Sequence, residues 1–199
     1  VICGAFEEIG YKVFTQVLNS KNFGVPQNRE RIYIVCFRSD IAPEKFAFPV
    51  HAGRKKVIRD ILDDAPIPSK YYLSNRYLEV LRAHKARHEV AGHGFGYAIR
   101  DLDDISGAIV CGGMGREGNL IIDHREHSMV PTTNIKGGIN EEDVQKMTPR
   151  EWARFQGFPE SFVLTEADTH LYKQFGNSVS VPVITAIAKR IKAVLDEAE

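Results

Sequence analysis

The sequence predicts an α/β fold interrupted by a loop-rich, mostly β region, and three observations point to it. The runs YKVFTQVLN (11–19) and RIYIVCFR (31–38) are β-branched and aromatic, which is typical of strands. Residues 92–140 are dense in glycine, with short strand-like runs between the glycines. Helical patterns then return at 148–159 and in an amphipathic segment that begins near Pro182.

Helices are expected on both sides of the two strands. Residues 1–9 have the pattern of a helix that Gly10 terminates. A short helix is expected over 55–64, before a pair of prolines, and a longer one over 74–90. The strand 31–38 carries apolar residues on both faces, which predicts that it is covered on both sides.

The last third of the chain carries explicit helix boundaries. Thr148 and Glu151 have the spacing of a capping box, and Pro149 stands at the first helical position. Gly157 is expected to end this helix, and Gly176 the following one.

The composition is that of a soluble globular protein. Of 199 residues, 43% are hydrophobic and 26% are charged. No run reaches the ~18–20 apolar residues that span a bilayer, and the first residues lack the basic leader of a signal peptide. The zero formal net charge excludes a uniformly basic nucleic-acid binder, but it leaves room for local basic patches.

The cysteines indicate a reducing compartment. Cys3, Cys36 and Cys111 are odd in number and lie in or beside apolar residues. Without a pairing pattern, they are interpreted as reduced, intracellular core thiols.

Two patterns suggest cofactors that the rest of the sequence does not support. GMGREG (113–118) matches G-x-G-x-x-G, but a strand-like run follows it where a dinucleotide-binding fold needs a helix. Its glycines fit a flexible turn better. The chain also holds several histidines at suggestive positions, but no cysteine pair or acidic ligand stands at a standard spacing, so no metal is predicted. These histidines are His84, His88, His93, His124 and His127.

Three ordered motifs carry the functional prediction. They are VPQNRERIYIV (25–35), MTPREWARFQGFPESF (147–162) and YKQFGNSVSVPV (172–183). Together they resemble the C-terminal third to half of bacterial DNA cytosine-5 methyltransferases of the restriction–modification type. The resemblance runs from about residue 8 to the end, with only general similarity over 40–110.

The resemblance implies an α/β fold: the C-terminal part of a Rossmann-like methyltransferase domain plus a smaller target-recognition domain. That chemistry acts on a cytosine flipped out of the duplex. Arg31 would contact the cytosine or its phosphate through its planar fork, and Arg29 and Gln27 would support the pocket. Taken alone, Arg29 and Arg31 are equally compatible with charges that protect an edge strand from aggregation.

The same resemblance assigns a cofactor and a DNA surface. Asn177, Ser178 and Val179 would line a pocket for S-adenosylmethionine. The target-recognition region, residues 92–140, would contact double-stranded DNA, and its candidate residues are Arg116, Glu117, Thr132 and Thr133. Arginine suits guanine and glutamate suits cytosine at base edges, whereas Thr132 would lie near a backbone phosphate.

The expected domain limits follow from the motif order. Residues 1–40 and 163–199 would belong to the catalytic α/β domain, and 41–162 would form the target-recognition domain. The family's Pro-Cys nucleophile is not found here, because no cysteine follows a proline. We therefore expect the chain to be inactive alone. Its catalytic partner would be an N-terminal half, on the same polypeptide or a separate subunit, in the bacterial cytoplasm. A non-catalytic DNA-binding module is the alternative.

Overall fold

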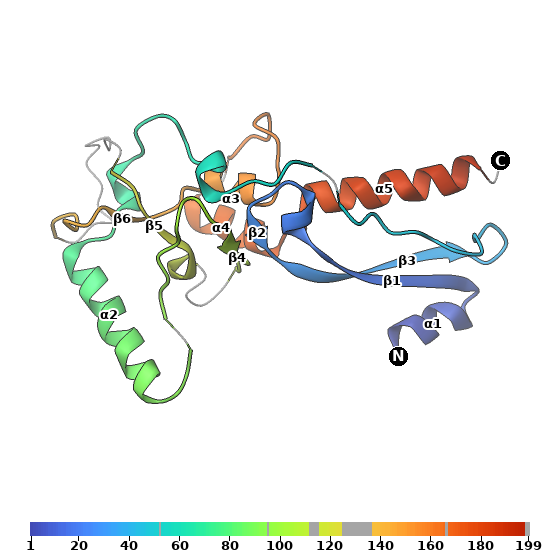
Figure 1. Cartoon of the computed structure of the whole chain (residues 1–199), viewed down its shortest axis with the longest axis horizontal. Helices are drawn as coiled ribbons and strands as arrows, with labels where there is room; N and C mark the ends of the chain where they lie inside the picture. Colours follow the sequence, from blue (N-terminus) through green and yellow to red (C-terminus); the bar gives the residue numbers. More distant parts are fainter. Residues whose placement is uncertain (52, 95, 112–115, 125–136, 166, 198–199) are drawn as a thin grey trace.

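The computed structural model of the chain describes residues 1–51, 53–94, 96–111, 116–124, 137–165 and 167–197. An arm built from β1, β3 and α5 extends from a broader body that holds α2, β5 and β6, with α3 and α4 near the junction (Figure 1). The helices are α1 (Ile2–Glu8), α2 (Asn75–Val90), α3 (Pro149–Phe155), α4 (Asp168–Asn177) and α5 (Val181–Asp196). The strands are β1 (Tyr11–Asn19), β2 (Gln27–Asn28), β3 (Glu30–Arg38), β4 (Ser106–Gly107), β5 (Leu120–Ile122) and β6 (Val144–Lys146).

The arm is an antiparallel hairpin with a helix packed on one face. β1 pairs with β3 along its full length, from Tyr11 opposite Arg38 to Asn19 opposite Glu30. Alternate side chains of the two strands form a core with α5, because successive residues of a strand point to opposite faces. The buried members of this core are Leu18, Phe23, Val35, Phe37, Phe48, Val183 and Ile187.

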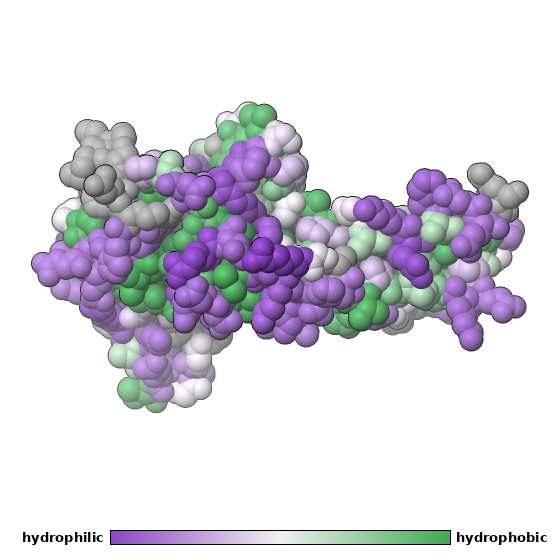
Figure 2. Space-filling model, turned by 45° about the horizontal axis from the view of Figure 1, so that its top comes forward, coloured by the Kyte–Doolittle hydropathy of each residue, from purple (hydrophilic) through white to green (hydrophobic). Residues whose placement is uncertain are grey.

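Among the described residues, the other face of the hairpin is covered only in part, where α1 packs on β1, so the prediction that strand 31–38 is covered on both sides is not met there. Val17 and Ile32 are paired across the strands, and they are 58% and 63% exposed. The pairs Val13–Cys36 and Thr15–Ile34 continue the same row. These six residues are called the outer hairpin face below. The surface in Figure 2 is mostly hydrophilic, but hydrophobic patches interrupt it over both the arm and the body.

The body has two cores. The larger one lies between α3 and α4, around Trp152, Phe155 and Phe175, and it draws in Ile58 and Ile109 from distant segments. The smaller one joins α2 to the β5–β6 pair through Leu73, Leu78, Leu81, Leu120 and Val144. The described parts of the glycine-rich region contain the short strands β4 and β5 and a 3-10 turn, Glu117–Asn119. Among the described residues, no helix is long and apolar enough to cross a membrane.

Most predicted helices are present, but the one over 55–64 is wrong. Only a 3-10 turn, Ile58–Ile61, forms there. The N–H groups of Ile58 and Arg59 donate to the carbonyls of Asp104 and Leu102, at 2.9 Å each. These long-range bonds take the place of helical ones, and the prolines that follow prevent extension.

The predicted caps of the last helices are largely confirmed. The Thr148 hydroxyl accepts a hydrogen bond from the Glu151 N–H, and the Glu151 carboxylate accepts one from the Thr148 N–H, which completes the capping box. Gly157 follows α3 with φ +75°. Gly176, in contrast, lies inside α4, which ends one residue later. It is small for another reason: a Cβ there would lie 2.5 Å from the Cys111 nitrogen.

The predicted domain limits, 1–40, 41–162 and 163–199, stay a prediction. The first and last of these segments meet in the arm, where α5 packs on the hairpin. Within the last segment, α4 packs on α3 in the body.

Candidate functional site

A fully buried glutamine stands where the arm meets the body. Gln27 belongs to β2, which pairs in parallel with β4, and its side chain is 0% exposed. Its amide nitrogen donates to the Phe155 carbonyl at 3.0 Å, and its amide oxygen accepts from the Ile109 N–H at 3.0 Å. Gln27 thus ties the hairpin to the end of α3 and to the segment that leads into the glycine-rich loop.

Arg29 extends the same connection with its guanidinium. It is 6% exposed and donates to three backbone carbonyls: Ile109 at 2.7 Å, Gly176 at 3.2 Å and Ser178 at 3.1 Å. Burial, followed by the nearby charge of Arg31, lowers the pKa of Arg29. Carbonyl dipoles rather than a carboxylate therefore compensate this buried cation.

Gln156, in the turn after α3, completes this arrangement, and the sequence analysis did not assign it. Its amide nitrogen donates to the Phe175 carbonyl at 2.8 Å, and its own carbonyl accepts from the Val181 N–H at 2.8 Å. The sequence signal that could have identified Gln156 is its place in the FQGFP motif. Gln27, Arg29 and Gln156 together are called the central clasp below. The clasp fixes the turn between α4 and α5 against the base of the hairpin.

Arg31 differs from Arg29 although only one residue separates them. Arg29 lies just before β3, whereas Arg31 is in the strand. Arg31 is exposed, and its guanidinium donates to the carbonyl of Glu30 at 2.6 Å. No other hydrogen bond or ion pair joins its side chain to the described residues. The two guanidinium groups are close enough for the charge of Arg31 to lower the pKa of Arg29.

That turn carries the predicted cofactor residues. Asn177 is the last residue of α4 and is exposed, and Val179 is about half exposed. Ser178 lies between them, with its hydroxyl donating to the Phe175 carbonyl at 2.8 Å. The turn thus presents an amide and an apolar side chain on a backbone that the central clasp holds in place.

Arg116 and Glu117, the two residues predicted to contact base edges, differ in their burial. Glu117 is 4% exposed, and its carboxylate accepts from the Tyr77 hydroxyl at 3.0 Å and lies 3.6 Å from the Lys146 ammonium. Burial, and then the Glu117 charge, raise the pKa of Tyr77 to about 12. This placement gives Glu117 a structural role and does not present it to a base edge. Arg116 is partly exposed, with its guanidinium 5.4 Å from the centre of the Tyr172 ring.

Thr132 and Thr133 lie outside the described residues, as do residues 113–115 of the GMGREG motif. The rings of His84 and His88 contact each other on α2, with 3.1 Å between their Nε2 atoms. The described part of the chain contains no group of three or more metal-ligating side chains. Cys3, Cys36 and Cys111 are free thiols, but Cys111 is exposed, so the prediction of a core thiol is wrong there.

A buried arginine just before β3 thus holds the Gly-Asn-Ser turn, and an exposed arginine follows it within the strand. Comparisons with known proteins identify the family. The model of the C-5 cytosine-specific DNA methylase family matches residues 1–193, so the chain belongs to that family.

Curated relatives match almost the whole chain. The Type II methyltransferase M.HpaII of Haemophilus parainfluenzae is 54% identical over 186 residues, which is 93% of this chain and 52% of that protein. M.NlaX of Neisseria lactamica is 38% identical over 195 residues, 98% of this chain and 57% of that protein. The chain therefore spans about half the length of the curated relatives it matches.

Solved structures share the fold at low sequence identity. The Entamoeba histolytica methyltransferase EhMeth superposes with a TM-score of 0.69 at 19% identity, covering 100% of this chain and 57% of that one. The S. pombe Dnmt2 methyltransferase superposes with a TM-score of 0.67 at 19% identity, covering 98% and 62%.

Proposed function

We propose that the chain is the DNA-recognising and cofactor-closing part of a DNA cytosine-5 methyltransferase. The complete enzyme transfers a methyl group from S-adenosylmethionine to carbon 5 of a cytosine flipped out of a specific duplex site. One observation carries the proposal: the guanidinium of Arg29 is bound to backbone carbonyls of the chain, whereas that of Arg31, two residues later in β3, is exposed and bonds only to the neighbouring Glu30 carbonyl among the described residues. Family membership over residues 1–193 supplies the reaction class.

Arg31 acts on the flipped base. A flipped cytosine presents its carbonyl oxygen, and its backbone presents phosphate oxygens; a guanidinium fork donates well to either. Because Arg31 is anchored by one bond to the neighbouring Glu30 carbonyl, its other N–H groups remain available. Arg29 and Gln27 are positioning residues, since they act by fixing the strand and the α4–α5 turn.

S-adenosylmethionine is the proposed cofactor, and it supplies an electrophilic methyl group. The α4–α5 turn suits a ligand with a polar amino-acid end and an apolar part, because the exposed amide of Asn177 and the side chain of Val179 flank it. Ser178 contributes its backbone, whose carbonyl Arg29 holds at 3.1 Å. These residues would hold and orient the cofactor.

The reaction needs a thiolate that this sequence does not supply in the family's form. The cysteines occur as VICGA, IVCFR and IVCGG, with no preceding proline. We place the nucleophile on a complementary N-terminal half, either on the same polypeptide or as a separate subunit, and the chain alone is inactive. A thiolate is required because covalent addition activates the ring carbon for methyl transfer.

The outer hairpin face is the proposed docking surface for that half. Val17 and Ile32 lie exposed at the end of the row nearer the body, and contiguous apolar surface of this kind marks an interface. The chain spans about half the length of its curated relatives, which leaves a domain-sized segment to cover this face. Double-stranded DNA is the other proposed partner, and its proposed contacts are Arg116, Thr132 and Thr133. The proposed compartment is the bacterial cytoplasm, where the DNA lies.

The test is transfer of labelled methyl from S-adenosylmethionine to duplex DNA. The chain is assayed alone, and mixed with the separately produced N-terminal half of a relative such as M.HpaII. Transfer by the mixture only is the expected result. Transfer by the purified chain alone would refute the assignment of the nucleophile. Duplex binding without transfer in any mixture would favour the non-catalytic DNA-binding module.

A further inference from the structure

The body contains a pocket of about 290 Å³ between α2, β6 and α4. Lys70, Tyr77, Arg116, Lys146, Asp168 and Tyr172 are among the residues that line it. We propose that this pocket binds one phosphate of the DNA backbone, held between Arg116 and Lys146. The inference rests on the proposed function, since it assumes that duplex DNA lies against the body. It assigns Arg116 to the backbone, where the sequence had suggested a base edge.

One side of the pocket is already neutralised. The Lys70 ammonium lies 2.6 Å from the Asp168 carboxylate, which also accepts from the Tyr71 hydroxyl at 3.0 Å. This closed group leaves no charge for a ligand. The anion must therefore be held elsewhere in the pocket.

Lys146 is a cation with spare donors. Its ammonium lies 3.6 Å from a Glu117 oxygen, which is longer than a hydrogen bond, and Tyr77 donates to that same oxygen at 3.0 Å. Burial is the main cause of the lowered pKa of Lys146, and the charge of Arg116 adds to it. An anion beside Lys146 would offset both effects, because it stabilises the charged ammonium.

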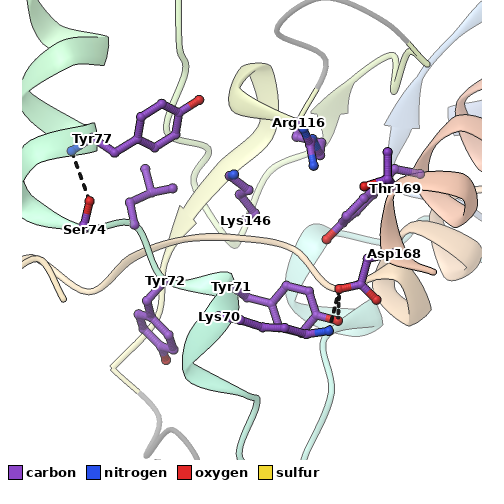
Figure 3. A pocket seen from close by; sticks show the side chains of 11 residues that line it. Lys70, Tyr71, Tyr72, Ser74, Tyr77, Arg116, Lys146, Asp168 and Thr169 are labelled. Atoms are coloured by element: carbon purple, nitrogen blue, oxygen red, sulfur yellow. Dashed lines mark hydrogen bonds and ion pairs between the residues drawn. The ribbon is translucent and has the colours of Figure 1, made fainter. Parts of the chain in front are cut away.

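Arg116 supplies the uncompensated charge. Its guanidinium lies over the Tyr172 ring, and no carboxylate among the described residues forms an ion pair with it. Figure 3 shows the Lys146 ammonium and the Arg116 side chain directed into one space between Tyr77 and Thr169. Two cations with one neighbouring carboxylate, that of Glu117 beside Lys146, leave one positive charge there, which suits one phosphodiester.

The position of the pocket favours a backbone phosphate near the reacting base. Tyr172 precedes Asn177 by five residues of α4, which is about 7.5 Å along the helix axis. Phosphates of one strand recur every ~3.4 Å along the duplex axis, so the pocket lies within a few nucleotides of the cofactor turn. Phosphates project from the duplex and can enter a recess, whereas base edges lie within the grooves.

The test measures duplex binding as a function of salt. The probes are a fluorescent random-sequence duplex and the duplex that the reconstituted mixture methylates. Arg116→Gln should weaken binding to both duplexes by about 10-fold. It should also reduce the slope of log K against log salt by about 1, because one phosphate contact is lost.

Three variants accompany it. Arg116→Lys keeps the charge and should keep the slope. Lys146→Gln should reduce the slope as Arg116→Gln does. The matched control is Arg82→Gln, on α2 of the same body, whose exposed side chain pairs with Glu142 outside the pocket; it should change neither affinity nor slope. A thermal melt of each variant verifies that it is folded.

Two results would overturn the proposal. If Arg116→Gln lowers affinity only for the duplex that the mixture methylates, and the slope of log K against log salt is unchanged, Arg116 contacts a base edge. The second result is that inorganic phosphate raises the melting temperature of the chain, that Arg116→Gln abolishes this effect, and that duplex binding is unchanged. The pocket would then bind free phosphate and not the DNA backbone. Binding to the random-sequence duplex is measured without methyl transfer, so a mixture that transfers no methyl would refute the proposed function and leave the affinity and salt slope measured with that duplex standing.

Discussion

The central clasp and the outer hairpin face invert the usual distribution of side chains. In the clasp, an arginine and two glutamines are buried, and their bonds to backbone carbonyls and N–H groups all lie within the chain. On the outer hairpin face, Val17 and Ile32 are exposed. At a rise of ~3.3 Å per residue, Ile32 lies no more than about 20 Å along the chain from Gln27 of the clasp. Gln27 and Arg29 of the clasp lie in the connection between β1 and β3, whereas Gln156 follows α3.

The difference separates what this chain completes by itself from what it leaves open. Buried polar groups are tolerated only where they are hydrogen-bonded, so the clasp is a finished part of the fold. An exposed apolar row loses the favourable free energy of burial until something covers it. We therefore expect the clasp to govern the stability of the chain and the outer hairpin face to govern its association.

The largest effect is expected from breaking the clasp. Arg29→Met removes three hydrogen bonds from a cation and leaves the carbonyls of Ile109, Gly176 and Ser178 short of donors. The free energy of unfolding should fall by about 3 kcal/mol or more, as measured by urea denaturation. Arg31→Met is the matched control and should leave the transition unchanged. Equal losses in both variants would contradict the distinction between the two arginines.

A smaller loss of stability is expected where the backbones are closest. Gly176→Ala would place a Cβ 2.5 Å from the Cys111 nitrogen, so the turn or the Cys111 segment must move. A destabilisation of about 1–3 kcal/mol follows from such overpacking. Gly118→Ala serves as control, because nothing lies within 4 Å of the Cβ that it adds. If Gly176→Ala stabilised the chain, as helix propensity alone would predict, the close approach would be disproved.

The outer hairpin face is probed by a charge. Ile32→Lys should leave the melting of the chain alone nearly unchanged, because Ile32 is exposed. It should raise the concentration of N-terminal half needed for methyl transfer by about 10-fold or more, since a buried isoleucine contributes ~1.5–3 kcal/mol. The control is Val80→Lys, at an exposed valine of α2. An unaffected Ile32→Lys mixture would place the docking surface elsewhere.

The smallest effect concerns the capping box of α3. Thr148→Ala removes the hydroxyl that accepts from the Glu151 N–H at 3.2 Å. The expected loss is about 1 kcal/mol in a urea titration. Thr148→Ser keeps the acceptor and should retain most of the stability. A full loss in the serine variant would point to packing of the methyl group instead.

Local signals predicted the strands and the caps, whereas long-range bonds decided the rest. The β-branched runs and the Thr148–Glu151 spacing depend on neighbours within a few residues, and both are present. The segment over 55–64 failed because Asp104 and Leu102 supply its backbone acceptors from more than forty residues away. Such pairings have no local pattern.

The candidate site shows the same division. The motifs selected Gln27 and Arg29, and the structure places both side chains between α3, α4 and the hairpin. The burial of Glu117 depends on Tyr77, forty residues earlier on α2. The role of Gln156 depends on the end of α4. Neither contact is visible without the fold.

The most direct measurement is methyl transfer by Arg31→Met mixed with the N-terminal half, read beside its urea melt. We expect an unchanged melt and transfer reduced by about 100-fold or more, as for loss of one preorganised donor at a reacting group. Transfer within a few-fold of the unmodified mixture would contradict the claim that the exposed arginine of this strand serves the flipped base.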